Sequence, residues 1–238
     1  MNQQSSSRGS ALIYILVAIA LLAALTVSLM EPAGQQTQSQ NSANLVSELG
    51  GQIGFITAGL SECVLTNPNQ DSELTATEQK NAPYPINPTD PYFTAQAATP
   101  GVDTTNDASK IRCPGNPGGT GANNQNHARI FGGSSGKFLP PPPSIFGNWT
   151  YYNGVDGVFI MIATSKTDPY IATALTKLDA KYSKCEADII DRRSAGSYDV
   201  TTEGAAPFVR TCSAGQLCFR YWVILKGTVT KHQDAGCP

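Results

Sequence analysis

The residues best suited to chemistry in this chain are its cysteines and histidines. There are six cysteines, namely Cys63, Cys113, Cys185, Cys212, Cys218 and Cys237. None forms a C-x-x-C pair, and only His127 and His232 could complete a zinc site, so the spacing does not favour structural zinc. An even set of cysteines on one side of an apolar segment is typical of disulfides in an oxidising compartment. We therefore predict disulfides, with metal binding as the alternative, and no cofactor.

Six cysteines allow many pairings, and sequence alone does not choose among them. Cys212 and Cys218 flank a short turn between two predicted strands. They could therefore face each other across a hairpin, and we predict this pair.

The histidines carry no catalytic pattern. His127 lies in an Asn- and Gly-rich stretch and His232 in a polar tail, and neither is near a nucleophile motif. We expect both at the surface and predict no enzyme activity. Four acidic residues could line a cation site, although a solvated helix face explains them more simply: Asp179, Glu186, Asp188 and Asp191. We propose no metal there.

Charge excludes another class of function. The net charge is −2 and only 14% of residues are charged, with no run of Lys or Arg. A nucleic-acid-binding protein normally carries a basic patch. The sequence therefore predicts no nucleic-acid partner.

The chain is organised around an uncharged apolar stretch from Ala11 to Met30. A helix of that length rises roughly 30 Å, the thickness of the hydrocarbon core of a bilayer. A cleaved secretory signal peptide is the alternative, but no small-x-small cleavage site follows Met30. The sequence therefore predicts a retained transmembrane helix over residues 10–30, in contact with membrane lipid.

The residues around this stretch resemble one bacterial family. A polar leader of residues 1–9 contains Arg8 and ends in Gly9, the apolar helix begins at Ser10, and Pro32 lies just beyond it. This arrangement resembles the class III leader and stalk of type IV pilins and of the pseudopilins of type II secretion. The resemblance implies that prepilin peptidase cuts the Gly9–Ser10 bond and methylates the new amino terminus. It also implies a kinking role for Pro32.

One residue departs from the family pattern. Major subunits usually place Glu five residues into the mature chain, where its carboxylate pairs with the charged amino terminus of a neighbouring subunit. Here that position is Tyr14. Minor subunits at a filament tip can lack the glutamate, so the resemblance implies a minor subunit whose partners are other pilin or pseudopilin subunits.

The distribution of basic residues predicts orientation. Arg8 is the only basic residue before the apolar stretch, and the next is Lys80. The positive-inside bias therefore places the amino terminus in the cytoplasm. We expect a single pass through the inner membrane, with the rest of the chain periplasmic or extracellular, where its cysteines can oxidise.

Beyond the apolar stretch, we predict an amphipathic stalk helix over residues 31–65. Its apolar residues recur at helical spacing: Leu45, Leu49, Ile53, Ile56, Leu60 and Val64. Glycines weaken such a helix, so its apolar face must be buried on a domain. Residues 66–148 are rich in Pro, Gly and Asn and predict a loop region that is either disulfide-tethered or partly disordered, and Cys113 favours tethering.

Residues 149–238 predict a disulfide-stabilised α+β head. A hairpin is expected over 149–164 around the turn at 153–157, because Asn-Gly and Asp-Gly pairs favour such turns. Asp168 and Pro169 predict the start of a helix. A second hairpin is expected from 207–212 and 217–225. The predicted fold is therefore α+β, with a transmembrane-plus-amphipathic helix as stalk and a head of antiparallel sheet carrying an inserted helix.

Two functional classes follow. The first is a structural minor pilin or pseudopilin anchored in the inner membrane, contributing to an envelope filament or its tip in adhesion, uptake or secretion. The alternative is a single-pass membrane-anchored extracytoplasmic binding or sensing protein. Cleavage at Gly9–Ser10 would separate the two.

Overall fold

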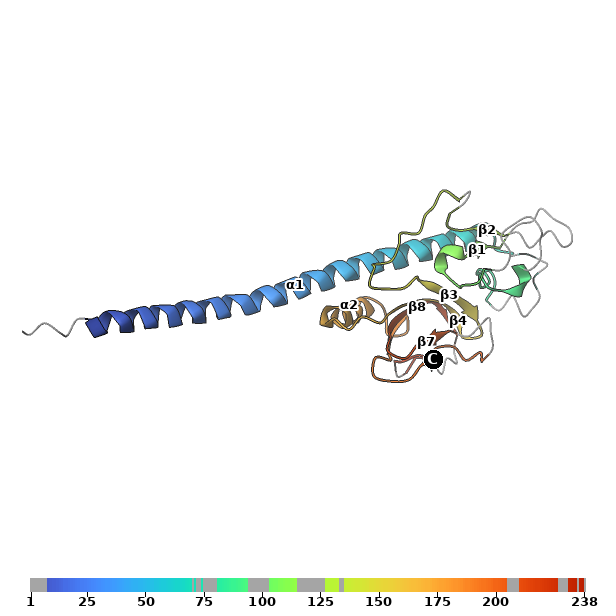
Figure 1. The fold of residues 1–238 in the computed structure, drawn as a ribbon. Coiled ribbons are helices and arrows are strands. Elements are labelled where there is room, and N and C mark those ends of the chain that lie inside the picture. The colour runs from blue at the N-terminus through green and yellow to red at the C-terminus, as the bar shows by residue number, and fades with distance from the viewer. Residues whose placement is uncertain are drawn as a thin grey trace, which may run out of the picture.

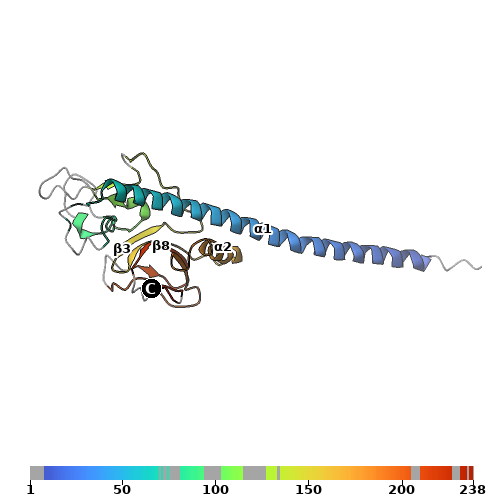
Figure 2. The same cartoon turned by 180° about the vertical axis from the view of Figure 1, so that it is seen from behind.

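The computed structural model describes most of the chain. The described residues are 8–69, 71, 74, 81–93, 103–114, 127–132, 135–204, 210–226, 231–234 and 236–237, with backbone only for 8–12 and 27–34. A long helix, α1, projects from a head formed by the rest of the described chain (Figures 1 and 2).

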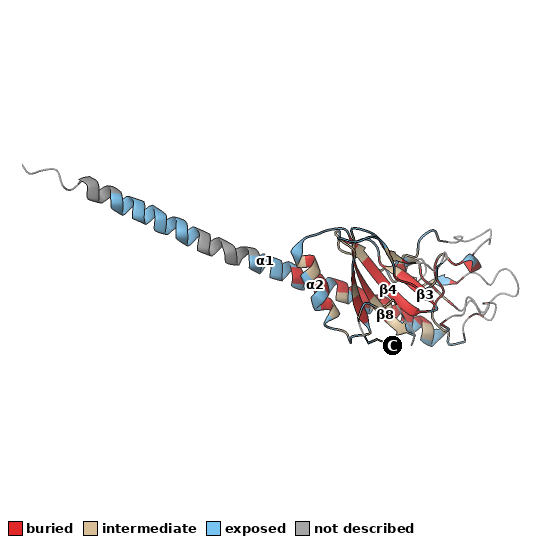
Figure 3. Cartoon of the chain, turned by 90° about the horizontal axis from the view of Figure 1, so that it is seen from below, coloured by how far each residue is buried: buried red, intermediate tan, exposed pale blue. Residues whose placement is uncertain are grey.

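Helix α1 runs from Arg8 to Thr66 and has 59 residues. The two predicted helical segments, 10–30 and 31–65, lie in one continuous helix that includes Pro32. The part nearer its C-terminus lies against the head, and the part nearer its N-terminus projects away from it (Figure 3). Its buried residues confirm the predicted apolar face: Leu45, Leu49, Ile53, Ile56 and Leu60. Val64 is only partly buried, and Cys63 is the buried residue at that end.

The membrane-spanning part of the predicted fold is contradicted. Within the described residues, no helix combines the length and the apolar character needed to cross a membrane. The transmembrane helix over 10–30, and with it the transmembrane-plus-amphipathic stalk, is therefore wrong as predicted.

The centre of the head is a four-stranded antiparallel sheet in the order β3-β4-β8-β5. Its strands are β3 (Thr150–Gly154), β4 (Gly157–Thr164), β8 (Leu217–Leu225) and β5 (Ala187–Asp191). β3 and β4 form the hairpin predicted over 149–164. Gly157, at φ 128°, allows the turn, since other residues rarely adopt this conformation.

Helix α2 (Pro169–Asp179) begins at the predicted position and buries Ile171, Leu175 and Leu178. It packs beside α1, where Leu178 lies close to Gly50. Side chains alternate along the strands, so the sheet has two covered faces. One face packs on α1 and α2, and the other packs on a smaller core that includes Tyr152, Phe159, Met161, Val200 and Trp222.

Short elements complete the described head. Two 3₁₀ turns, η1 (Pro91–Phe93) and η2 (Ala108–Lys110), lie in the predicted loop region, as do β1 (Arg112–Cys113) and β2 (Ala128–Arg129). β6 (Tyr198–Asp199) pairs with β7 (Thr211–Cys212). The predicted second hairpin is therefore wrong, because β7 pairs with β6 and β8 lies between β4 and β5. Residues 207–209 lie outside the described residues.

All six cysteines form disulfides, as predicted. The pairs are Cys63–Cys113, Cys185–Cys237 and Cys212–Cys218. The first tethers the loop region to α1, and the third confirms the predicted pair across a turn. The glycine-rich segment 115–121 lies outside the described residues.

The outer edge of β3 is closed by other parts of the chain. Strand edges expose unpaired N–H and C=O groups unless something covers them. Here the covering bonds are Ala108 N to Trp149 O, Tyr151 N to Asn106 O, Arg210 Nη2 to Tyr151 O, Asn153 N to Asn87 Oδ1 and Asn87 Nδ2 to Asn153 O, at 2.7 to 3.0 Å.

Candidate functional site

Residues 13–26, in the projecting part of α1, present an apolar surface on every side of the helix. Their large apolar side chains are between 50% and 73% exposed, and they are Ile13, Tyr14, Ile15, Leu16, Val17, Ile19, Leu21, Leu22 and Leu25. Leaving apolar surface in water costs about 25 cal/mol for each Å² that could be buried. Contiguous exposed apolar surface of this kind marks an interaction site. We call residues 13–26 the exposed stem.

The same helix is fixed in the head by a buried polar contact. Gln52 is buried, and its side chain bridges two segments of the head. The indole Nε1 of Trp149 donates to Gln52 Oε1 at 2.7 Å, and Gln52 Nε2 donates to the carbonyl of Pro141 at 2.8 Å. A buried amide with both ends paired fixes the rotation of the helix as well as its position.

Close packing and a covalent bond hold the end of the helix. At Gly59 an added Cβ would lie 2.9 Å from side-chain atoms of both Ile130 and Phe131. The absence of a side chain therefore lets this turn of α1 approach the loop region. One turn further on, Cys63 is bonded to Cys113. We call residues 45–63 the seated half of α1.

The residues predicted for processing belong to the start of α1, and the N-terminal end of this helix projects away from the head (Figure 1). Gly9 and Ser10 lie in the first turn of α1, and Pro32 lies between the exposed stem and the seated half. The side chains of Ser10 and Pro32 are outside the described residues. Tyr14 is in the exposed stem, with 73% of its surface exposed. The structure thus places Tyr14 where another molecule could contact it.

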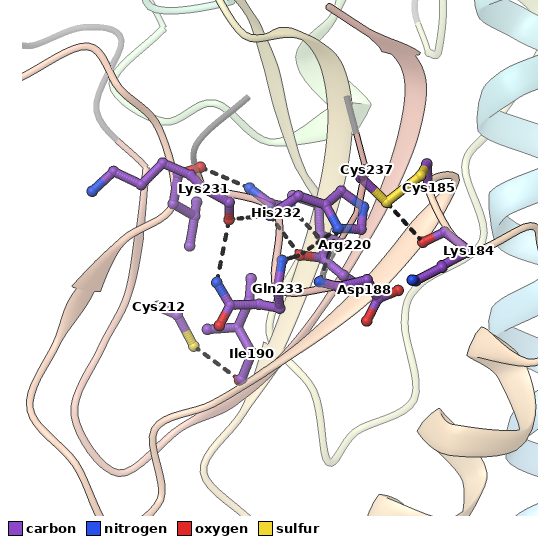
Figure 4. Close-up of polar contacts among 12 residues, drawn as sticks. Lys184, Cys185, Asp188, Ile190, Cys212, Arg220, Lys231, His232, Gln233 and Cys237 are labelled. Atoms are coloured by element: carbon purple, nitrogen blue, oxygen red, sulfur yellow. Dashed lines mark hydrogen bonds and ion pairs between the residues drawn. A yellow bond between two sulfur atoms is a disulfide. The ribbon is translucent and has the colours of Figure 1, made fainter. Parts of the chain in front are cut away.

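A buried ion pair lies on the face of the sheet that points away from α1 (Figure 4). Asp188 on β5 and Arg220 on β8 are cross-strand neighbours, and both are fully buried. Arg220 Nε donates to Asp188 Oδ1 at 2.8 Å, and Nη2 donates to Oδ2 at 2.6 Å. Arg220 also lies over the Trp222 ring, 4.6 Å from its centroid.

This pair corrects the expectation for the acidic group. Asp188 is neither on a solvated helix face nor in a cation site, because Arg220 neutralises it. Asp191 pairs with Arg193 at 2.6 Å, and Glu186 accepts a hydrogen bond from the backbone N–H of Ser183. In the described part of the chain, no three His, Cys, Asp or Glu side chains lie together as a metal site would need.

The surface positions expected for the histidines are also wrong. His127 is buried, with Nε2 at 2.9 Å from Asp71 Oδ2, and the Tyr92 hydroxyl donates to the same oxygen at 2.5 Å. Burial lowers the pKa of His127, although Asp71 opposes this shift. The His232 side chain is buried 4.0 Å from Asp188, and burial lowers its pKa too. Both imidazoles are therefore parts of the packed head.

Sequence reasoning missed Gln52 and Arg220, and it named Asp188 without its partner. Arg220 carried a usable signal, because it is the one charge in the apolar strand C-F-R-Y-W-V-I-L. A charge in such a strand needs a buried partner. Gln52 carried no comparable signal, since glutamine is common on exposed helix faces.

These observations separate an exposed apolar stem from a closed, disulfide-bonded head. No protein family, curated protein or solved structure matched the chain. The functional conclusion therefore rests on the chain's own residues.

Proposed function

We propose that this protein is a structural subunit of a pilin-like envelope filament, present as a minor component. In this assembly the exposed stem packs against the corresponding helices of neighbouring subunits, and the head is displayed on the outside. The observation that carries the proposal is the apolar surface of residues 13–26 on a helix whose other half is seated in the head.

The energetics favour helical neighbours as the cover. A helix in a protein gains most of its stability when its apolar side chains pack against other segments. The exposed stem receives no such packing from the described head. Neighbouring apolar helices would bury side chains on several sides of the stem at once. The seated half would keep the head at a fixed rotation while the stems pack.

The disulfides support a place outside the cytoplasm for the head. Bonds such as Cys63–Cys113 form and persist in oxidising compartments. A filament subunit assembled at the cell envelope meets this condition.

The amino-terminal sequence supports a minor role. The chain resembles pilins in its leader and in the Gly9–Ser10 junction but has Tyr14 where bulk subunits carry Glu. A tyrosine hydroxyl answers a neighbouring amino-terminal cation only weakly, whereas a carboxylate pairs with it. The amino terminus of this subunit can therefore form an ion pair with a partner's glutamate, but the subunit has no glutamate to pair with a partner's amino terminus. This suits a few copies at one end of a filament.

The decisive test is processing. In cells with prepilin peptidase, the mature chain should begin at methylated Ser10, and Gly9→Leu should block the cut. Mass spectrometry of the intact protein, with and without the peptidase, reads both results. A chain that keeps Met1 in peptidase-containing cells would contradict the proposal and favour the alternative of an extracytoplasmic binding or sensing protein.

A second experiment tests the stem. A photo-crosslinking residue at Ile19 should capture other filament subunits, while the same residue at exposed Lys181 on the head serves as control. Equal capture from both sites, or none from Ile19, would contradict stem packing. Tyr14→Glu should raise the number of copies in isolated filaments. Long filaments made by the native protein alone would overturn the minor role.

A further inference from the structure

The C-terminal segment covers the buried ion pair with its backbone. We call Lys231–Asp234 with Gly236–Cys237 the tail (Figure 4). The carbonyl of Lys231 accepts a hydrogen bond from Arg220 Nη2 at 2.8 Å, and the N–H of Gln233 donates to Asp188 Oδ2 at 3.0 Å. The tail thus contributes one acceptor to the cation and one donor to the anion.

These contacts matter because both charges are withdrawn from water. Asp188 and Arg220 have no exposed side-chain surface. A buried ion pair is tolerated only when further hydrogen bonds satisfy its remaining donors and acceptors. Val200 O supplies one more bond, to Arg220 Nη1 at 2.7 Å. The tail therefore decides whether the pair is sealed or open to solvent.

A single covalent bond fixes the end of this cover. Cys237 is joined to Cys185, just before β5, and lies four residues beyond Gln233. Both of its cysteines are partly exposed. Each of the other two disulfides has at least one buried cysteine, since Cys63, Cys212 and Cys218 are buried. A reductant in solution therefore reaches Cys185–Cys237 first.

The rest of the head does not depend on the tail for its framework. The sheet order β3-β4-β8-β5 includes no tail residue, and the core between the sheet and α1 is built from other segments. Cys63–Cys113 and Cys212–Cys218 hold those segments separately. Release of the tail can thus occur without loss of the sheet.

We propose that the redox state of the Cys185–Cys237 disulfide controls whether the tail covers the Asp188–Arg220 ion pair. A dithiol reductant supplies two electrons by thiol–disulfide exchange. The S–S bond between Cys185 and Cys237 breaks, the dithiol becomes a disulfide, and its two protons end on the two cysteine thiols. The tail then leaves, water reaches the ion pair, and the sheet stays folded. Reoxidation restores the cover.

The test uses the full chain under graded dithiothreitol. Alkylation of released thiols, followed by peptide mass mapping, orders the three disulfides, and hydrogen exchange reports the backbone at each dose. Cys185 and Cys237 should be alkylated at the lowest dose. At that dose, exchange in residues 231–237 should rise roughly tenfold or more, while β4 and β8 keep their protection.

Two variants serve as a matched comparison. Cys185→Ser with Cys237→Ser should exchange rapidly in the tail without reductant. Cys63→Ser with Cys113→Ser should keep the tail protected, because its fastening is intact. Three results would each overturn the proposal: a tail that stays protected after its bond opens, earlier alkylation of another pair, or simultaneous loss of protection in β4 and β8.

Discussion

The exposed stem and the seated half of α1 are parts of one helix with opposite surroundings. In the seated half, Leu49, Ile56 and Leu60 have no exposed surface. In the exposed stem, residues of the same types, such as Ile19 and Leu22, are more than half exposed. The stem is almost wholly apolar, whereas the seated half alternates apolar residues with Gly, Ser, Glu and Gln, but the apolar residue types are the same in both. What differs is whether a partner covers the side chains, and the head covers only one part.

The comparison indicates which part stabilises the monomer. The seated half should carry nearly all of the contribution of α1 to the folding free energy, and the exposed stem should contribute little while its side chains are uncovered. The same substitution made in each part tests this difference, because its effect on the free energy of unfolding can be compared directly.

The largest effect is expected from truncation of a seated apolar side chain. Ile56→Ala should lower the free energy of unfolding by about 2–5 kcal/mol, because it removes buried contacts and leaves a cavity. Ile19→Ala in the exposed stem should change it by less than about 0.5 kcal/mol. Urea unfolding of the unassembled protein measures both. Similar losses at the two sites would show that the stem is covered in the monomer.

Removal of the Cys63–Cys113 bond should come next. The bond joins residues 50 positions apart, so it restricts a long loop in the unfolded chain. Replacing both cysteines by Ser should cost roughly 2–4 kcal/mol under oxidising conditions. The measurement is again urea unfolding, beside the wild type in reductant. A negligible loss would mean that packing alone seats the helix.

Gln52→Ala should cost about 1–3 kcal/mol, because it leaves the buried Trp149 Nε1 and the Pro141 carbonyl without their partner. Gln40→Ala, at an exposed position on the same helix, is the control and should be nearly neutral. Trp fluorescence during unfolding follows both variants. If the two variants lose equal stability, the amide bridge does not fix the helix.

Alanine substitutions at two glycines of α1 should change the free energy of unfolding in opposite directions. Gly54→Ala has open space around the new Cβ and should stabilise by up to about 1 kcal/mol through helix propensity. Gly59→Ala meets Ile130 and Phe131 at 2.9 Å and should destabilise by about 1 kcal/mol or more. Thermal unfolding compares the pair. A gain in stability for both variants would mean that Ile130 and Phe131 can move away from the new methyl group without loss of stability.

The smallest effect should come from pH, and it concerns the helix that flanks the seated half. Burial at the end of α2 raises the pKa of Asp179 to about 6, with Asp234 and Asp188 adding repulsion. An acid whose pKa is raised by folding stabilises the protein while protonated. Its contribution is complete below pH 4 and disappears as pH rises through 6.

Asp179→Asn isolates this contribution. The variant should be more stable than the wild type at pH 7, and the difference should shrink on acidification toward pH 4. Unfolding at several pH values measures it, and the exposed stem should show no matching change in helicity. A difference that does not vary with pH would contradict the raised pKa.

Features coded by neighbouring residues could be predicted from the sequence. The hairpin β3-β4, the start of α2 at Pro169 and the Cys212–Cys218 pair all depend on signals a few residues apart. The buried face of α1 could also be predicted, because its periodicity required a covering domain. Local turn chemistry and helical spacing are short-range information.

Features that depend on distant segments could not be predicted. The partner of β7 is β6, which comes from a polar stretch without strand character. The burial of His127 depends on Asp71, which is 56 positions away. The Asp188–Arg220 pair forms only when β5 and β8 become neighbours in the sheet. The transmembrane prediction is contradicted because no helix within the described residues is long and apolar enough to cross a membrane.

The closed edge of β3 has a consequence for crowding. In the proposed filament, the head of this chain would lie against the heads of other subunits at high local concentration, which is the condition under which open strand edges join into intermolecular sheets. On β3 the outward groups of Trp149, Tyr151 and Asn153 are already bonded within the chain. Neighbouring heads can therefore touch along this edge without exchanging backbone hydrogen bonds. If the chain assembles as proposed, pairing along the β3 edge would therefore not join its head to its neighbours.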